Sequence, residues 1–219
     1  IGMLVQLFIS GMNSALTPWM YSKIKKGDIR SMRKVLQLLS VVVVGIAVAL
    51  MLISPELVLI FGSPKYREAV YVIPPVAASV FFVFIYNILS MPQFYYEKTQ
   101  FLMAASMAAA GANVVLNFIF IRLFGYIAAG YTTLACYMLY SVGHYIVSKR
   151  ILVNEGIREN LMSPGFLVAC SVFLIGASII CNLIFPYRIL RYAILLASAG
   201  LVFWKKELLL KTMADIRKK

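Results

Sequence analysis

The chain has 219 residues, of which 62% are hydrophobic and only 13% are charged. Soluble domains carry about 25% charged residues, so this composition argues against a soluble domain and favours a membrane protein. The net charge of +13 does not favour nucleic-acid binding, because the basic residues lie in bunches between long apolar runs instead of covering a polar face.

Seven runs that are almost free of charge follow one another along the sequence. They cover residues 1–22, 35–55 (continuing past Glu56 to Phe61), 69–96, 99–121, 123–148, 160–187 and 189–204. Six of them reach the roughly 20 residues that a helix needs to cross a bilayer, and the last, which contains Arg191, is the weakest. The runs do not alternate as barrel strands would, so we expect an all-α polytopic membrane protein with about seven transmembrane helices.

These runs divide the chain into four expected parts. They are a five-helix bundle (1–148), a cytoplasmic connection (149–164), two accessory transmembrane helices (165–204) and a basic cytoplasmic tail (205–219). The sequence opens with "IGMLVQLFIS", without an initiator methionine or a basic leader. We therefore expect a piece of a longer protein whose first helix is truncated at its start.

Lysine and arginine residues are distributed unevenly between the connections on the two sides. If the first helix ends in the cytoplasm, sixteen of the 21 basic residues fall on that side and five on the other. The sixteen lie within residues 23–34, at Lys98, within 149–158 and within 205–219. Cytoplasmic loops carry an excess of basic residues, so this asymmetry predicts seven crossings of the cytoplasmic (inner) membrane and a cytoplasmic C-terminus.

The sequence offers little material for catalysis. It contains no Ser/His/Asp set, no metal-ligand spacing and no glycine-rich phosphate loop, so we expect no enzyme, no metal and no cofactor. His144 is expected to be an interfacial side chain, with a proton relay as the alternative. Glu56 is expected to face water or a helix terminus, with coupling to a transported ion as the alternative.

Uncharged polar residues inside the apolar runs are candidates for a substrate path. Asn113 and Asn117 are four residues apart and therefore share one helix face. An amide is costly in lipid, so both should face protein or a water-filled cavity. Interhelical hydrogen bonds and the lining of a substrate path are both open readings here, and Asn13, Asn87 and Gln93 raise the same question on other helices.

Four of the prolines inside the apolar runs are candidates for helix kinks: Pro18, Pro74, Pro75 and Pro92. Proline removes a backbone hydrogen bond, so we expect each to kink its helix. Kinked helices suit a transporter that bends during its cycle, and they equally suit a bundle with fixed packing.

Residues 1–148 contain four stretches that together carry a family pattern. They read "SALTPWMYSKIKKGD" (14–28), "LISPELVLIFGSPKYREAVYVIPPVAASVFF" (52–82), "FYYEKTQF" (94–101) and "NVVLNFIFIRLFGYIAAGYTTLACYMLY" (113–140). These stretches resemble bacterial polysaccharide flippases, which export polyprenyl-pyrophosphate-linked oligosaccharides such as O-antigen units. The flippases belong to the multidrug/oligosaccharidyl-lipid/polysaccharide exporter superfamily, which also includes multidrug and toxic compound extrusion transporters and the lipid II flippase.

The resemblance implies a fold with two pseudosymmetric lobes around a central cavity. The chain would be the second lobe without its first helix, followed by two accessory helices, and its partners would be the first lobe, membrane lipids and the lipid-linked oligosaccharide. The cations that attract the pyrophosphate in this family lie largely in the first lobe, so none is carried over to this sequence. Asn113 and Asn117 fall on a helix that resembles one facing the cavity.

The resemblance therefore implies a flippase that works by alternating access. One alternative is a cation-coupled drug antiporter of the same fold, which would need an apolar cavity and an essential buried carboxylate. A second is a membrane glycan polymerase or acyltransferase, which would need a large outer loop or a His/Arg/Asp site. A third is a scaffold lobe that no longer transports.

Overall fold

Helices make up all the regular structure in the part of the chain that the computed structural model describes, residues 2–62 and 64–204. Their order is α1 (Gly2–Lys25), α2 (Ile29–Leu52), α3 (Ser54–Phe61), a 3-10 helix η1 (Pro64–Val72), α4 (Ile73–Tyr95), α5 (Gln100–Phe124), α6 (Ala128–Asn154), α7 (Pro164–Ile184) and α8 (Arg188–Trp204). The expected all-α class is confirmed for these residues. The expected basic tail, 205–219, lies outside them.

Each apolar run of the sequence contains one long helix, with differences at the boundaries. The run 69–96 is divided, because η1 ends at Val72 and α4 begins at Ile73. The expected connection 149–164 is shorter than predicted, because α6 continues to Asn154 and α7 begins at Pro164. Charged residues after Ser148 therefore do not end α6, which gains a further turn and a half at the polar end of the bundle.

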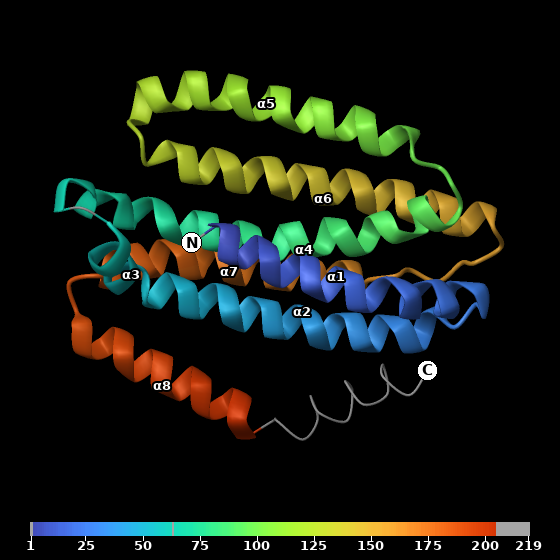
Figure 1. Cartoon of the computed structure of the whole chain (residues 1–219), viewed down its shortest axis with the longest axis horizontal. Helices are drawn as coiled ribbons and strands as arrows, with labels where there is room; N and C mark the ends of the chain where they lie inside the picture. The colour runs from blue at the N-terminus through green and yellow to red at the C-terminus, as the bar shows by residue number, and fades with distance from the viewer. Residues whose placement is uncertain (1, 63, 205–219) are drawn as a thin grey trace.

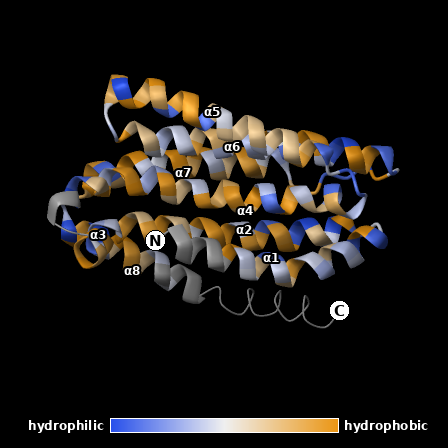
Figure 2. Cartoon of the chain, turned by 45° about the horizontal axis from the view of Figure 1, so that its top comes forward, coloured by the Kyte–Doolittle hydropathy of each residue, from blue (hydrophilic) through white to orange (hydrophobic). Residues whose placement is uncertain are grey.

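Four stretches are long and apolar enough to cross a membrane, judged by length and composition. They are α2, residues 67–95 (most of η1 with α4), α5 and α7. Exposed surfaces agree with apolar surroundings, because large hydrophobic side chains such as Met107, Val114 and Val172 are more than half exposed. Figure 2 shows that hydrophobic residues predominate along the middle of the helices.

α4 is the centre of the bundle and packs against α1, α2, α6 and α7. Its residues are apolar almost all round, which is typical of a helix that is covered on every side. Phe81, Phe84 and Ile88 are almost completely buried there. Figure 1 shows the α5–α6 pair at one edge and α8 at the opposite edge, with α1, α2, α4 and α7 between them.

α7 is an integral part of the bundle rather than an accessory helix, because it packs against both α2 and α4. Leu174 and Ser178 of α7 are fully buried. α8 is more peripheral and contacts α2 and α7. Of the two helices expected to be accessory, α7 therefore packs against the centre of the bundle and α8 lies at its edge.

A charged turn joins α1 to α2. Gly27 has a φ of 66°, a left-handed value that suits glycine, and Asp28 then caps α2 by accepting a hydrogen bond from the backbone N–H of Ser31 at 3.3 Å. The ammonium of Lys23 donates to the second carboxylate oxygen of Asp28 at 2.5 Å. Within residues 23–28 ("KIKKGD"), Gly27 therefore follows the end of α1 and Asp28 caps the start of α2.

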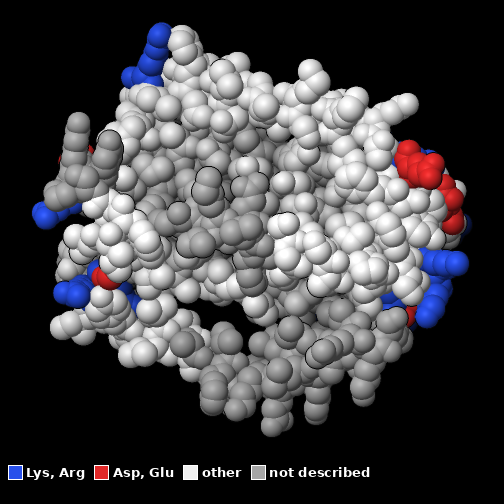
Figure 3. Space-filling view, viewed as in Figure 1, with Lys and Arg blue, Asp and Glu red and all other residues white. Residues whose placement is uncertain are grey.

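Charged side chains gather at the two ends of the helices, and on the face that Figure 3 shows the described residues of the belt between them carry no charge. We call one end the Lys23 end, because it holds the α1–α2, α4–α5 and α6–α7 connections. The contacts that cross it are Arg30 to Glu159 at 3.2 Å, Arg33 to the carbonyl of Asn160 at 2.7 Å and Lys98 to Glu155 at 3.1 Å. The described segments that the charge count assigns to the cytoplasm therefore touch one another.

The opposite end, which we call the Glu56 end, holds the α2–α3–η1, α5–α6 and α7–α8 connections. Tyr126 donates to Glu68 at 3.0 Å, and Asn182 donates to the hydroxyl of Tyr131 at 3.2 Å. Glu68 and Tyr126 lie in connections that the charge count assigns to the other side, and Tyr131 and Asn182 lie near the ends of α6 and α7 that lead to these connections. The chain thus has two polar ends and an apolar middle, the arrangement expected of a bundle that crosses a bilayer.

Candidate functional site

A groove of about 470 Å³ opens between α1, α2, η1, α4 and α6, and we call it the α4–α6 groove. Most of its wall is aliphatic, from residues such as Ile9, Val76 and Val83. Four hydroxyl-bearing side chains also line it: Ser79, Tyr86, Thr133 and Tyr137. A concave, mainly apolar wall with a few polar groups is the usual composition of a ligand site.

Tyr86 and Tyr137 form the aromatic part of this groove. Their rings are almost parallel, with an interplanar angle of 3° and centroids 6.2 Å apart. Tyr86 comes from α4 and Tyr137 from α6, so the pair also joins the two helices that pack most extensively. Flat aromatic faces with hydroxyl groups beside them are suited to binding the apolar faces and hydroxyls of a sugar.

The groove continues toward the Lys23 end as a stripe of polar and aromatic side chains along α6. Its members are three or four residues apart, so they share one helix face: Thr133, Tyr137, Tyr140, His144 and Ser148. Tyr86 connects the groove to the rest of the stripe, because its ring lies 4.7 Å from Tyr140 and 5.9 Å from His144. The spacing is present in the sequence, but the sequence alone indicates only His144 as a candidate functional residue.

Gln93 and His144, two separate candidates in the sequence, form one buried pair. Both are 0% exposed. The amide nitrogen of Gln93 lies 2.8 Å from Nδ1 of His144 and donates to the carbonyl of Leu89 at 3.3 Å. His144 is therefore not the interfacial side chain expected from the sequence, because α6 continues ten residues beyond it and keeps it inside the bundle.

Asn113 and Asn117 lie together at the α5–α6 contact. The amide of Asn117 donates to the side-chain oxygen of Asn113 at 2.9 Å, and the hydroxyl of Thr132 donates to Asn117 at 2.5 Å. These bonds satisfy the amides across two helices, which favours the interhelical reading of this pair over a substrate path. Neither asparagine lines the α4–α6 groove.

The other two amide candidates are also not among the residues that line the groove. The amide of Asn87 donates to the carbonyl of Val83 in its own helix at 2.7 Å. Asn13 is half-buried in α1, and its side-chain oxygen has no hydrogen-bond partner among the described residues. Its backbone carbonyl accepts a bond from Thr17 at 2.7 Å.

Glu56 forms an ion pair at the end of the bundle opposite His144. It lies in the first turn of α3, and both of its oxygens accept hydrogen bonds at 2.9 Å from the guanidinium of Arg191 in α8. Tyr192 donates to the same carboxylate at 2.8 Å, and Arg191 also donates to the carbonyl of Leu52 at 2.7 Å. The sequence alone does not pair these residues, because 135 positions separate them.

The ion pair sets the ionisation of Glu56. Burial acts to raise the pKa of this carboxyl, but the hydrogen bonds from Arg191 and Tyr192 outweigh burial. The net result is a pKa below the ordinary value of 4.5. Glu56 is therefore a charged, fully engaged carboxylate at neutral pH, and its two oxygens already hold the donors that a coupling cation would have to displace.

The four prolines fall into two classes. Pro18 lies inside α1 and Pro92 inside α4, where each removes one backbone hydrogen bond. Pro74 and Pro75 do not kink a helix, which corrects the expectation for them. They lie in the first turn of α4, where a missing N–H costs no hydrogen bond.

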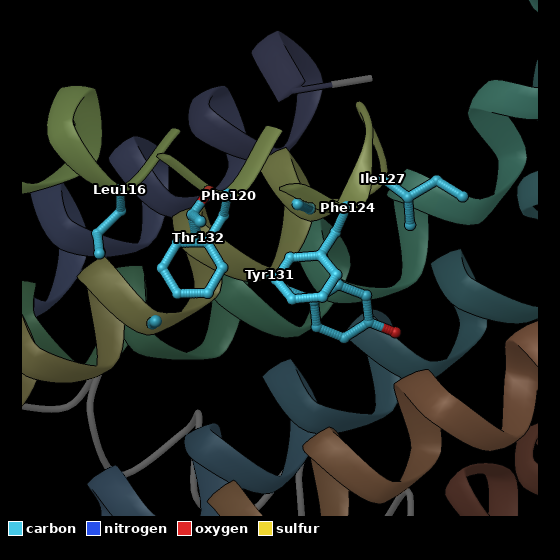
Figure 4. A pocket seen from close by; sticks show the side chains of 8 residues that line it. Leu116, Phe120, Phe124, Ile127, Tyr131 and Thr132 are labelled. Carbon is cyan, nitrogen blue, oxygen red and sulfur yellow. The ribbon is translucent and has the colours of Figure 1, made fainter. Parts of the chain in front are cut away.

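A second hollow, of about 430 Å³, lies between α5 and α6. Figure 4 shows Leu116, Phe120 and Phe124 facing Tyr131 and Thr132 across it. Almost all of this wall is hydrocarbon, which suits a lipid chain or another apolar surface better than a sugar. We therefore take the α4–α6 groove as the candidate site.

Among residues 2–62 and 64–204, no group of three His, Cys, Asp or Glu side chains could hold a metal ion. No protein-family model, curated protein or solved structure matches the chain.

Proposed function

We propose that the chain is the second lobe of a transporter that flips polyprenyl-pyrophosphate-linked oligosaccharides across the cytoplasmic membrane. The resemblance to bacterial polysaccharide flippases supports this function, and the α4–α6 groove carries it. The groove combines two tyrosine rings and two further hydroxyls with an aliphatic wall, in the uncharged middle of the bundle. Sugars bind to such surfaces through stacking and hydrogen bonds.

The proposed arrangement has seven spanning helices, with the Lys23 end in the cytoplasm. Contacts within each end support it, because they join only segments that the positive-inside count assigns to the same side. The glycan would occupy the α4–α6 groove and the first lobe would cover its open side. The polyprenyl tail would stay in lipid while the two lobes rock between inward-open and outward-open states.

A drug antiporter of the same fold is the second candidate, and the aliphatic part of the groove wall favours it. That function calls for a carboxylate that can exchange its counter-ion. Glu56 has both oxygens engaged by Arg191 and lies in α3, which contributes no residue to the groove wall. The engaged carboxylate makes the flippase the better supported of the two.

A photo-crosslinking experiment tests the proposed substrate. A photoreactive residue replaces Tyr137 in the full-length protein, and a matched one replaces Val168, which is 61% exposed on α7. Lipid-linked oligosaccharide with a radiolabelled glycan is added to the reconstituted protein, with and without unlabelled competitor. We expect saturable labelling at position 137, which the competitor removes, and weak labelling at 168 that does not compete.

Equal, non-competed labelling at the two positions would contradict the proposal. Competition at position 137 by hydrophobic cations, without competition by the lipid-linked oligosaccharide, would favour the antiporter. Growth of the labelled glycan in the same sample would favour a polymerase.

A further inference from the structure

The buried Gln93–His144 pair is a polar site that the proposed glycan groove leaves without a role. It lies near the Lys23 end, since Gln93 is two residues from the end of α4. The aromatic ring of Phe101, in the first turn of α5, packs 5.4 Å from the imidazole. Three helices therefore meet at His144, and a change in this side chain would be felt by all three.

The hydrogen bonds of Gln93 define the charge state of the imidazole. With the amide oriented toward the carbonyl of Leu89, its nitrogen also donates to Nδ1 of His144. A ring nitrogen that accepts a bond carries no proton, so the imidazole is neutral and its proton is on Nε2. In this neutral form the pair contributes one hydrogen bond between α4 and α6, in addition to the bond from Ser141 to the carbonyl of Phe82.

A second proton on the imidazole of His144 would remove the hydrogen bond from Gln93. When the lone pair of Nδ1 takes up a proton, the new N–H points at the N–H of Gln93 and the hydrogen bond is lost. Turning the amide over would restore a bond to Nδ1, but it would bring the amide oxygen against the carbonyl of Leu89. Protonation therefore breaks either the contact between α4 and α6 or the contact of Gln93 within α4.

Aromatic rings surround the imidazole on three sides. Their centroids lie 4.5 Å (Tyr140 of α6), 5.4 Å (Phe101 of α5) and 5.9 Å (Tyr86 of α4) from that of His144. Rings within about 6 Å attract a cation that lies over their faces, so these rings would offset part of the cost of burying an imidazolium. The titratable groups that face the imidazole are the phenols of Tyr86 and Tyr140.

Two of the carboxylates at this end are held by other cations. Glu155 pairs with Lys98, and Glu159 pairs with Arg30. Two polar atoms of the pair, Nε2 of His144 and the side-chain oxygen of Gln93, have no hydrogen-bond partner among the described residues, and neither does the hydroxyl of Ser148 four residues further along α6. Buried atoms of this kind are uncommon, and they mark the site as one that is not optimised for stability alone.

We propose that His144 is a proton-binding site whose protonation releases α4 from α6 at the Lys23 end and so couples transport to protons. The ligand is a proton, which adds one positive charge and forms one N–H bond at Nδ1. The coupling step rests on the proposed function, whereas the release of the helices does not.

Hydrogen exchange followed by mass spectrometry tests the release. The full-length protein is studied in lipid nanodiscs between about pH 7.5 and pH 4.5, a range that brackets the ordinary imidazole pKa. Exchange rates of the inner ends of α4 and α6 are corrected for the intrinsic effect of pH. One linked proton raises the opening equilibrium by about tenfold per pH unit, so we expect the wild-type protein to approach that slope.

Two variants separate protonation from a simple loss of contacts. His144→Gln can bond to Gln93 but cannot titrate, so its corrected exchange should not depend on pH. Ser141→Ala is the matched control, because Ser141 donates to the carbonyl of Phe82 and joins the same helices without a titratable group. It should exchange faster at every pH and keep the wild-type slope.

A third variant covers the case in which His144→Gln does not fold. Gln93→Met removes the donor and keeps the imidazole, so exchange should already be fast at pH 7.5 and respond little to acid. Wild-type and His144→Gln proteins with the same slope would overturn the proton site. A Gln93→Met protein with the wild-type slope would overturn it as well.

Transport measurements distinguish this proposal from the proposed function. Glycan transport that responds to a proton gradient in the wild type and not in His144→Gln is the expected result. A His144-dependent exchange response in a protein that moves no lipid-linked oligosaccharide would overturn the flippase and leave the proton site intact. Glycan transport by a protein that lacks the His144-dependent exchange response would overturn the proton site and leave the flippase intact.

Discussion

At the scale of single residues, Glu56 and Arg191 show how a charged pair is tolerated at the edge of an apolar bundle. Arg191 is only 3% exposed, yet its guanidinium forms two hydrogen bonds to Glu56 and one to the carbonyl of Leu52. A buried charge is costly unless it is paired and hydrogen-bonded, and this site meets both conditions. The pair fastens α8, the edge helix, to α2 and α3.

Removing one partner of this pair should cost more than removing both. Glu56→Gln leaves the buried guanidinium without a counter-charge, and we expect a loss of about 2 kcal/mol, below the range for fully buried pairs because Glu56 is partly exposed. The double variant Glu56→Leu/Arg191→Leu should lose less than either single change. Thermal unfolding in detergent measures all of these, and additive losses would contradict the coupling.

The same pair predicts a pH dependence. In the folded protein the pKa of the Glu56 carboxyl lies below its ordinary value of 4.5. The stabilisation from the ion pair is therefore fully present above pH 4.5 and is lost as the pH falls through the folded pKa. The wild-type Tm should therefore drop in acid more steeply than the Tm of Glu56→Gln. Parallel acid curves for the two proteins would assign the loss to other groups.

At the scale of elements, much of the helix layout could be predicted from the sequence, because long uncharged runs leave the backbone no alternative to helices. The boundaries could not, since they depend on contacts. Pro74 and Pro75 look like kinks inside one run, but the chain forms a 3-10 helix before them and uses them to start α4. His144 looks interfacial only when α6 is assumed to end at its first charged residue.

The start of α6 packs closely against η1 and α4, and the sequence alone does not reveal this contact. A Cβ atom on Gly130 would lie 2.7 Å from the ring of Pro75 and 2.9 Å from the carbonyl oxygen of Val72. Neither group can move easily, so Gly130→Ala should destabilise the bundle by about 1–3 kcal/mol. Gly45→Ala in α2 is the matched control, because no atom lies within 4 Å of that Cβ.

Thermal unfolding of the two glycine variants gives opposite expectations. Gly45→Ala should be neutral or stabilising by about 0.5–1 kcal/mol, because alanine is the better helix former. An equal loss in both variants would mean that helix α6 does not approach η1 and α4 as closely as the distances at Gly130 indicate.

At the scale of the whole molecule, the candidate site is a property of packing rather than of any motif. The sequence alone indicates Asn113 and Asn117 as candidates, but in the structure they form hydrogen bonds at the contact between α5 and α6. The tyrosines of the groove attract no attention in the sequence, because α4 and α6 are rich in aromatic residues and only their packing brings Tyr86 beside Tyr137. Gln93 and His144 are likewise 51 positions apart and meet only in the bundle.

Movement of a glycan headgroup across a membrane is the central claim, and a flipping assay in sealed liposomes tests it most directly. The liposomes contain polyprenyl-pyrophosphate-linked oligosaccharide with a fluorescent glycan, and an impermeant quencher reports the fraction on each side. We expect the protein, together with the proposed first lobe, to move the glycan, and Tyr137→Ala to slow this movement about tenfold through a lost aromatic contact of about 1.4 kcal/mol. A full-length protein that leaves the glycan on its original side would contradict the account.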